Sequence, residues 1–509
     1  MTANAIHIKI KNHKPKPDKF KKVMLWILLF AGIIGVLYSL SLIIRFASSP
    51  NQMDFGEGFG TYIAQLWANG QFNWKPDVEP YMTMIYGVVY PTLMAPFVHL
   101  FGPDLRIGRA FSILATAVIA FLIYLIAKRY TKNRFVPFIA ALLPFTYFGY
   151  QEWIMQTRCD MTAIMFEAIG LYLAIRFWNQ GKKVLWCVPF ILLAFFTKQS
   201  IVTVGIAVGI GLLFANRSMF VRYLIIMVSS LIAVILIGNI LTEGQFWKQL
   251  VTYNITSPFF NPKGNTVLVW FQIVFPMALG TILVIAYFVK NLQAKKVNLP
   301  GIWVIVAMLV NGFALLRYAA FVNYAIETVI AMGLVTALYF DTEIKNRLPV
   351  VIAMVFQALM VVMFYSYGIH FIPMPDQDYQ NRINNVKAII QDSTKPIYTE
   401  HAGVILSAGK SPYYEPFIFT QLIEHGNWNE QTLLDDMRNG NIEYFVMQSP
   451  YYSEIHDEAL PGHVPESAKQ LLRDNYTIVY STYDGGVYNH FWYSYTVYES
   501  NKKLGMVSK

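Results

Sequence analysis

Two acidic residues three positions apart, Asp54 and Glu57, follow the first long apolar run of the chain. That run, residues 23–44, contains no charged side chain and is long enough to cross the roughly 30 Å hydrocarbon core of a bilayer. Carboxylates at the mouth of a membrane helix are costly to bury and are usually tied to function. Such a pair can act as a general base, or can hold a divalent cation through its oxygen atoms.

Further polar side chains are expected on the same, outer side of the bilayer, near the ends of other apolar runs. Lysine and arginine can neutralise a phosphate there, while an acid accepts a proton from a hydroxyl. Together they suit a reaction in which an acceptor hydroxyl attacks a phosphate-linked carbon and a lipid phosphate departs. Tyr90 in the first outer loop is either a substrate contact or an ordinary interfacial kink. The other candidates are Arg158, Asp160, Lys198, Gln199, Arg317, Asn323 and Glu327.

These residues also have purely structural interpretations. Asp54 and Glu57 could cap the helix that follows them, because acids stabilise a helix start. Arg158 and Asp160 could form an interfacial ion pair, and Lys198 could extend toward the lipid headgroups. The functional interpretation therefore depends on all of them converging on one membrane face.

The composition indicates a polytopic helical membrane protein. Of 509 residues, 55% are hydrophobic and only 14% charged, and apolar runs of about 17 to 25 residues recur along the chain. The net charge of +10 comes from basic residues grouped on alternate connections, as the positive-inside rule requires, so it does not indicate nucleic-acid binding. Two cysteines, Cys159 and Cys187, cannot build a disulfide framework or a zinc site.

Three regions are predicted: a basic cytoplasmic tail (1–22), a membrane domain (23–367) with a long first outer loop (46–104), and an extracytoplasmic α/β domain (368–509). The first outer loop should contain an amphipathic helix at 57–69, and Pro91 and Pro96 argue against an unbroken span over 81–101. In the last region, strands are expected at 397–398, 444–447, 476–480 and 492–498, and helices at 381–391 and 430–439. About eleven membrane helices are expected, at 23–45, 105–127, 135–150, 160–178, 184–198, 200–215, 223–241, 266–289, 300–317, 324–340 and 349–367.

Several short motifs follow one another between about residues 23 and 340. They are Asp54-Phe55-Gly56-Glu57-Gly58, Leu66…Asn69-Gly70, Tyr90-Pro91-Thr92-Leu93, Leu100-Phe101-Gly102-Pro103…Arg109, Arg158-Cys159-Asp160-Met161, Phe196-Thr197-Lys198-Gln199 and Asn323-Tyr324…Glu327. As a set, they resemble the membrane-embedded glycosyltransferases of the GT-C fold. The resemblance is to the branch with protein O-mannosyltransferases, lipid A aminoarabinose transferases and bacterial RgtA/B/C/D-like enzymes.

The resemblance implies a polyprenyl-phosphate sugar donor in the outer leaflet and an inverting displacement. It carries the role of catalytic base to Asp54, with Glu57 assisting or binding a metal or a sugar hydroxyl. Better-known relatives have adjacent acids, whereas these are three apart, which leaves the division of roles open. A divalent cation (Mg²⁺ or Mn²⁺) is possible but not required. Asp160 would orient an arginine or the sugar, and the donor phosphate would be held by Arg158, Lys198 and Arg317.

The expected protein is thus a hexosyl- or pentosyltransferase of the bacterial inner membrane, with its N-terminus in the cytoplasm and its C-terminus outside. Its acceptor would be an extracytoplasmic glycan, lipid or protein. A secondary transporter is the main alternative, although no inverted repeat or matched pair of broken helices is apparent. A further alternative is an oligosaccharide ligase with a lipid-diphosphate donor. A non-catalytic membrane scaffold is the least favoured alternative, because it would not need acidic residues at the ends of membrane helices.

Overall fold

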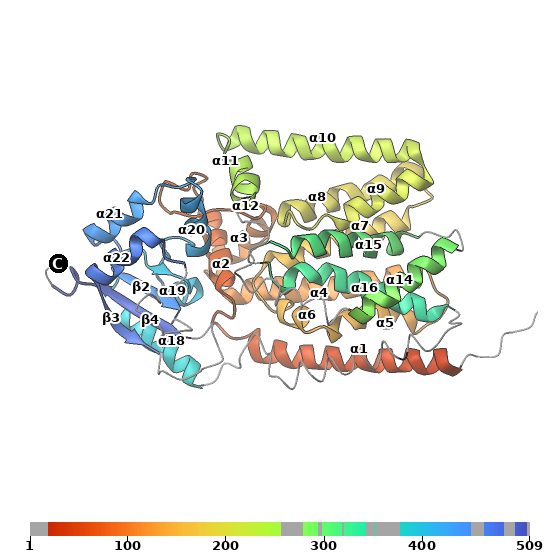
Figure 1. The fold of residues 1–509 in the computed structure, drawn as a ribbon, viewed down its shortest axis with the longest axis horizontal. Helices are drawn as coiled ribbons and strands as arrows, with labels where there is room; N and C mark the ends of the chain where they lie inside the picture. Colours follow the sequence, from red (N-terminus) through yellow and green to blue (C-terminus); the bar gives the residue numbers. More distant parts are fainter. Residues whose placement is uncertain are drawn as a thin grey trace, which may run out of the picture.

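The computed structural model describes residues 19–255, 278–293, 298–317, 320–342, 351, 377–448, 463–482 and 494–505. Figure 1 shows a bundle of long helices at one end of the molecule and a small sheet flanked by helices at the other. Most of the predicted basic tail lies outside the described residues. So does the predicted helix 349–367, except for Val351.

Four helical segments are long and apolar enough to cross a membrane, judged by length and composition over the described residues. They are α1 (Lys19–Phe46), α4 (Leu105–Lys128), α10 (Arg217–Leu241) and the continuous segment of η5 (Val322–Ala325) and α16 (Ile326–Asp341). Shorter helices complete the bundle, so the count of eleven spans stays a prediction. These are α5 (Val136–Leu142), η1 (Leu143–Thr146), α6 (Phe148–Trp153), α7 (Cys159–Arg176), η2 (Gly181–Cys187), α8 (Val188–Thr197), α9 (Thr203–Ala215), α14 (Ala278–Gln293) and α15 (Leu299–Ala314).

Polar caps mark where several of these helices begin. The side chain of Asp104 accepts a hydrogen bond from the Arg106 amide at the start of α4, and Asn216 accepts one from the Met219 amide at the start of α10. Asn298 does the same for the Gly301 amide at the start of α15. These oxygens satisfy amides that have no partner inside the helix.

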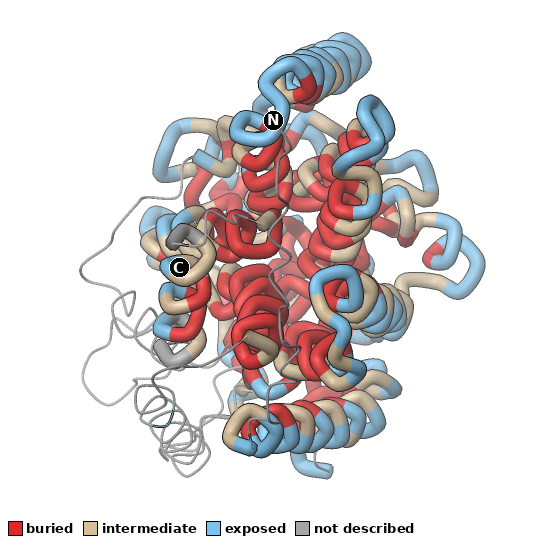
Figure 2. Tube along the Cα trace, turned by 90° about the vertical axis from the view of Figure 1, so that its right-hand side faces the viewer, coloured by how far each residue is buried: buried red, intermediate tan, exposed pale blue. Residues whose placement is uncertain are grey.

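Burial separates the central helices from the peripheral ones. In the apolar window of the η5–α16 segment, 94% of the residues are buried, against none in that of α10. Figure 2 shows the same contrast, with buried residues concentrated in the middle of the bundle and exposed residues on its outer helices. α10 exposes a row of large apolar side chains, among them Leu236 and Ile240, as a helix facing lipid would.

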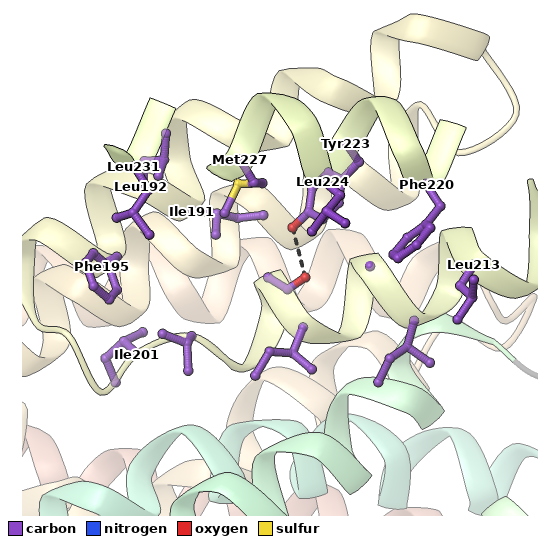
Figure 3. Close-up of a pocket in the computed structure, with 15 residues that line it drawn as sticks. Ile191, Leu192, Phe195, Ile201, Leu213, Phe220, Tyr223, Leu224, Met227 and Leu231 are labelled. Carbon is purple, nitrogen blue, oxygen red and sulfur yellow. Dashed lines mark hydrogen bonds between the residues drawn. The ribbon is translucent and has the colours of Figure 1, made fainter. Parts of the chain in front are cut away.

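An apolar cavity of about 420 Å³ lies between α10 and the helices α8 and α9. Figure 3 shows its wall of aliphatic and aromatic side chains, including Ile191, Phe195, Leu213 and Met227. The one hydrogen bond drawn there runs from the Tyr223 hydroxyl to the Gly205 carbonyl, at 2.8 Å. This bond ties α10 to α9 beside the cavity.

The first outer loop forms two helices, α2 (Phe55–Ala68) and α3 (Val89–Phe101). The prolines were expected to interrupt any helix within 81–101. This expectation is wrong for the last part of that range, because α3 continues through Pro96. Pro91 is the third residue of α3, where its missing N–H removes no internal bond. α3 has only 13 residues, so its length, and not its prolines, keeps it from crossing a bilayer. A second outer segment forms the short elements α11 (Gln245–Trp247), η3 (Lys248–Thr252) and α12 (Tyr253–Ile255).

The C-terminal region contains a four-stranded mixed sheet of order β1-β2-β4-β3. β1 (Tyr398–Thr399) runs parallel to β2 (Tyr444–Gln448), and β4 (Tyr495–Ser500) is antiparallel to both β2 and β3 (Tyr476–Ser481). Each strand overlaps one of the four ranges expected from the sequence. The helices are α18 (Gln377–Ile389), α19 (Ala402–Ser407), α20 (Pro416–Glu424), α21 (Gln431–Asn439) and α22 (Glu466–Asn475).

One apolar cluster joins this region to the first outer loop. Phe59 and Tyr62 of α2 share it with Tyr414 and Phe419 near α20. The Trp428 indole N–H also donates to the carbonyl of Pro76, at 2.9 Å. The sheet region is therefore fastened to the loop that follows the first long helix.

Candidate active site

The loop from α1 to α2 is held by one buried arginine, Arg109 of α4. Its guanidinium donates to the backbone carbonyls of Phe46, Ser49 and Asn51 at 2.9, 2.5 and 2.5 Å. It also donates to both carboxylate oxygens of Glu57, at 3.0 and 2.9 Å. These contacts occupy all five N–H donors of an arginine. Arg109 thus fixes residues 46–57, the segment that carries both predicted acids, against α4.

Glu57 is fully engaged by this arrangement. Besides Arg109, its carboxylate accepts hydrogen bonds from the amides of Met53 and Thr157, at 2.6 and 2.8 Å. Burial acts to raise the pKa of Glu57, but the charge and hydrogen bonds of Arg109 and the two amides outweigh it, so this pKa is lowered. The side chains of Glu57 and Arg109 are both 0% exposed. These contacts are those of a structural anchor.

Asp54 caps α2 and also forms an ion pair. Its Oδ1 accepts a hydrogen bond from the Gly56 amide at 3.0 Å and lies 3.1 Å from Nε of Arg158. A Cβ atom at Gly56 would stand 1.8 Å from Nη1 of Arg158, so the guanidinium can lie against α2 only because residue 56 is glycine. No described residue donates a hydrogen bond to the other oxygen, Oδ2. Burial raises the pKa of Asp54, and Arg158 only partly opposes that shift.

Lys198 and Asp160 form a second buried pair. Nζ of Lys198 lies 2.5 Å from Oδ1 of Asp160, and the same oxygen accepts a hydrogen bond from the Asn323 amide group at 2.9 Å. The rings of Tyr324 and Tyr86 also face Nζ, with centroids at 4.7 and 5.6 Å, a cation–π arrangement. The Lys198 side chain is only 2% exposed, against 17% for Arg158, so Arg158 is the more accessible cation.

The start of α7 connects the two ion pairs. Arg158 is its N-cap and Asp160 its second residue, and the structure pairs each of them with a different partner. Arg158 and Asp160 therefore do not pair with each other, as one structural interpretation suggested. Instead, Arg158 pairs with Asp54, and Asp160 pairs with Lys198. Two side chains that the sequence analysis did not select, Tyr86 and Tyr324, belong to this cluster. Tyr324 was quoted only as part of the motif Asn323-Tyr324…Glu327, and that motif was the signal that could have revealed its role.

Gln199 and Arg317 connect backbone segments at the edge of the site, which we call its rim: the loop at Ile85 and the segment 245–255. The Gln199 side chain donates to the carbonyls of Ile85 and Leu250, at 3.0 and 3.2 Å. The Asn254 side chain donates to the same two carbonyls, at 2.5 and 3.0 Å, and Arg317 donates to the carbonyl of Asn254. Arg317 thus contacts the outer segment 245–255, which adjoins the loop before α3.

Glu327 and Tyr90 face other surroundings. Glu327 lies one turn after Asn323, where it accepts hydrogen bonds from the Thr203 hydroxyl and, at 3.2 Å, from the Asn311 amide group. Its carboxylate is therefore part of a polar cluster inside the bundle, between α9, α15 and α16. The hydroxyl of Tyr90 is buried and has no hydrogen-bond partner among the described residues. A Cβ at Gly108 would lie 2.8 Å from this oxygen.

Residues 87–241 match the family model described as dolichyl-phosphate-mannose-protein mannosyltransferase. Among solved structures, the chain is similar to ArnT from Cupriavidus metallidurans in the apo state, with a TM-score of 0.56 and 13% identity over 94% of this chain and 98% of that one. The structure of that ArnT bound to undecaprenyl phosphate gives a TM-score of 0.55 and 12% identity over 93% and 97%. This chain has the GT-C fold. No curated protein matches it in sequence.

The GT-C fold confirms the resemblance drawn from the motifs, and with it the description of the chain as an integral membrane protein. The likeness to ArnT extends over nearly the whole length of both chains, although the motifs covered only residues 23–340. It therefore includes the C-terminal sheet region. Asp54 follows Asn51 and Gln52, which contact that region, and Arg158 is paired with Asp54.

One further acidic residue of this GT-C chain lies at the site and was missed by the sequence analysis. Glu415 is the N-cap of α20, and its side chain makes no capping hydrogen bond. Burial raises the pKa of Glu415 to about 7, against the opposing charges of Arg158 and His463, and Asp54 adds to the rise. Glu415 is thus within electrostatic reach of the Asp54–Arg158 pair. It lies in an aromatic stretch, between Tyr414 and Pro416, with no recognisable motif, so its residue type alone could not have singled it out.

A divalent cation does not fit the pair of acids near the start of α2. Among the described residues, no three His, Cys, Asp or Glu side chains gather in a way that could hold a metal ion. Both oxygens of Glu57 already accept hydrogen bonds, whereas Mg²⁺ and Mn²⁺ need free carboxylate oxygens. The metal-binding role considered for Asp54 and Glu57 together therefore does not match their geometry.

Proposed function

We propose that this protein is a membrane glycosyltransferase that moves a sugar from a polyprenyl-phosphate donor to an extracytoplasmic acceptor. The observation that carries the proposal is the Asp54–Arg158 pair at 3.1 Å, in a GT-C fold and next to residues 51 and 52, which contact the sheet region. The donor class is supported by the similar ArnT structure, which was solved with undecaprenyl phosphate bound.

In the proposed reaction, an acceptor hydroxyl attacks the sugar carbon that carries the phosphate. Oδ2 of Asp54, which receives no hydrogen bond from a described residue, takes the hydroxyl proton. The bond between sugar carbon and phosphate oxygen breaks with inversion, and its electron pair stays on the phosphate. A positioned base contributes about two to four powers of ten in rate. Arg158, held beside the base, stabilises the charge that develops on the departing phosphate.

The remaining candidates then support the reacting groups. Glu57 anchors the Asp54 loop through Arg109. Lys198, expected to hold the donor phosphate, is paired with Asp160 at 2.5 Å and enclosed by two tyrosine rings. We therefore assign Lys198 and Asp160 to shaping the floor of the site beside Arg158, with Asn323 fixing the carboxylate. Gln199 and Arg317 would hold the rim.

A direct test uses the purified protein in lipid nanodiscs with a set of undecaprenyl-phosphate sugars, each labelled in a hexose or a pentose. Envelope extract supplies the acceptor. A transferase should release undecaprenyl phosphate and move the label to an acceptor. A transporter would leave the donor intact, and an oligosaccharide ligase would consume only a diphosphate-linked donor. Intact donor across the whole set would overturn the proposal.

A further inference from the structure

We propose that Glu415, supplied by the C-terminal region, completes the donor-phosphate site by donating a hydrogen bond from its carboxyl group to a phosphate oxygen. This inference rests on the proposed function, because it places the donor phosphate beside Arg158. It adds a ligand-contacting residue that lies far along the chain from the base.

Close contacts hold the C-terminal region, which carries Glu415, against the Asp54 loop. The Gln52 side-chain oxygen accepts a hydrogen bond from the Gly403 amide at 2.6 Å, and the Gln52 carbonyl accepts one from the Tyr379 hydroxyl at 2.8 Å. Asn51 donates to the Gln380 side chain at 2.7 Å. A region held this tightly to residues 51 and 52 has little freedom to move away from Asp54.

α20 is part of the same contact. Tyr414 and Phe419, on either side of its first turn, share an apolar cluster with Phe59 and Tyr62 of α2. The rings of Tyr414 and Phe419 are stacked at 4.6 Å. α20 and α2, whose N-terminal ends carry Glu415 and Asp54, therefore contribute side chains to one apolar cluster.

Among the acids near the site, Glu415 has the most hydrogen-bonding capacity left. Both oxygens of Glu57 are engaged, and Asp160 is bound by Lys198 and Asn323. Asp54 retains one oxygen, which the proposed reaction uses. No described residue makes a hydrogen bond with the Glu415 side chain, and that side chain is only half-buried. Its carboxyl group is thus available to a ligand next to Arg158.

The chemistry of a phosphate ligand requires this carboxyl group to be neutral. An ionised carboxylate would repel a phosphate, whereas a protonated one donates a hydrogen bond to it. The charges that Glu415 faces are those of Arg158, His463 and Asp54, and burial outweighs the first two, so its pKa is raised to about 7. The His463 ring itself contacts Glu400, with Nδ1 2.7 Å from Oε1 of that carboxylate. A large share of the molecules therefore carry the proton at neutral pH.

The test measures binding of undecaprenyl phosphate to the full-length protein by native mass spectrometry. Glu415→Ala removes the donor, Glu415→Gln keeps an N–H donor of similar size, and Glu424→Ala changes an exposed acid at the far end of the same helix. At about pH 6, where a carboxyl with a pKa near 7 is mostly protonated, Glu415→Ala should bind roughly 10- to 100-fold more weakly than wild type. Glu415→Gln and Glu424→Ala should bind as wild type does.

A measurement at a second pH distinguishes the titration of the Glu415 carboxyl group from that of the lipid phosphate, because the latter is the same for every variant. At about pH 8.5, where Glu415 is ionised, wild type should bind more weakly than Glu415→Gln. Unchanged binding by Glu415→Ala at the lower pH, or a Gln variant as weak as the Ala variant, would overturn the role of Glu415 alone. A wild-type protein that binds no undecaprenyl phosphate would overturn the donor class, and the role of Glu415 with it.

Discussion

At the scale of single residues, the proposed base differs from its neighbouring acid in what its oxygens contact. Replacing Asp54 by Asn removes the proton acceptor but keeps a side-chain oxygen that can cap α2. Turnover should therefore fall by roughly 10²- to 10⁴-fold while the melting temperature stays close to that of wild type. Release of labelled undecaprenyl phosphate, measured beside a thermal melt, checks both. Near-normal turnover would remove Asp54 from the chemistry.

Glu57 should behave in the opposite way. In Glu57→Gln, an amide group faces Arg109 and two backbone amides that all need an acceptor, so a buried cation loses its partner. Breaking a buried pair of this kind costs about 3–5 kcal/mol. Activity should fall together with the melting temperature, and Arg109→Met should show the same coupled loss. A Glu57→Gln protein that is stable but inactive would instead restore a catalytic role to this residue.

The pH dependence follows from the raised pKa of Asp54. A base works only when ionised, so kcat/KM should be high above this pKa and fall as the pH drops through it. The fall should begin at a higher pH than for an ordinary aspartate, because burial raises the pKa of Asp54. The guanidinium of Arg158 acts to lower that pKa, so Arg158→Gln should move the acid limb to still higher pH. An acid limb that stays in place in the variant would count against the pairing.

At the scale of elements, the approach of α2 to α19 depends on glycine. A Cβ atom at Gly58 would lie 2.1 Å from the Gly403 amide nitrogen, whereas at Gly60, two residues further along α2 and on another side of the helix, the nearest atom is 3.8 Å away. Gly58→Ala should therefore push α19 away from α2 and lower both stability and turnover. Gly60→Ala should be neutral or stabilising by up to about 1 kcal/mol. Thermal melts of the two variants provide the comparison, and equal behaviour would contradict the close packing.

Elements with a strong periodic signal could be predicted from the sequence, and those that depend on distant partners could not. The apolar runs that form α4, α7 and α10 are local features of the sequence. The predicted ends of these helices agree with the structure to within a few residues, except for the start of α10. Pro96 was expected to interrupt a helix, because proline disfavours helix interiors, yet it lies inside α3. Topology predicted that Asp54 and Arg158 would lie near one another at one membrane face, but not that they would form an ion pair. The Arg109–Glu57 pair was not predicted, because 52 residues separate its members and Arg109 sits in an otherwise apolar run.

At the scale of the whole molecule, the proposed topology places the sheet region outside the cell. Cys159 and Cys187 are both buried, so an introduced surface cysteine should be labelled without background from them. A membrane-impermeant maleimide applied to intact cells should react with Glu424→Cys, at the exposed C-terminal end of α20. Lys183→Cys, on a connection predicted to be cytoplasmic, should react only after permeabilisation. Labelling of both, or the reverse order, would overturn the predicted orientation.

The hydrogen bond between Gln52 and Gly403 spans 351 positions of sequence. During synthesis, the segment bearing the proposed base leaves the ribosome long before the partner that pins it. Until translation has passed residue 403, that segment is restrained only by earlier parts of the described chain, through Arg109, Thr157 and Arg158. On the proposed function, we expect the protein to become active only after residues 377–505 have folded onto that segment.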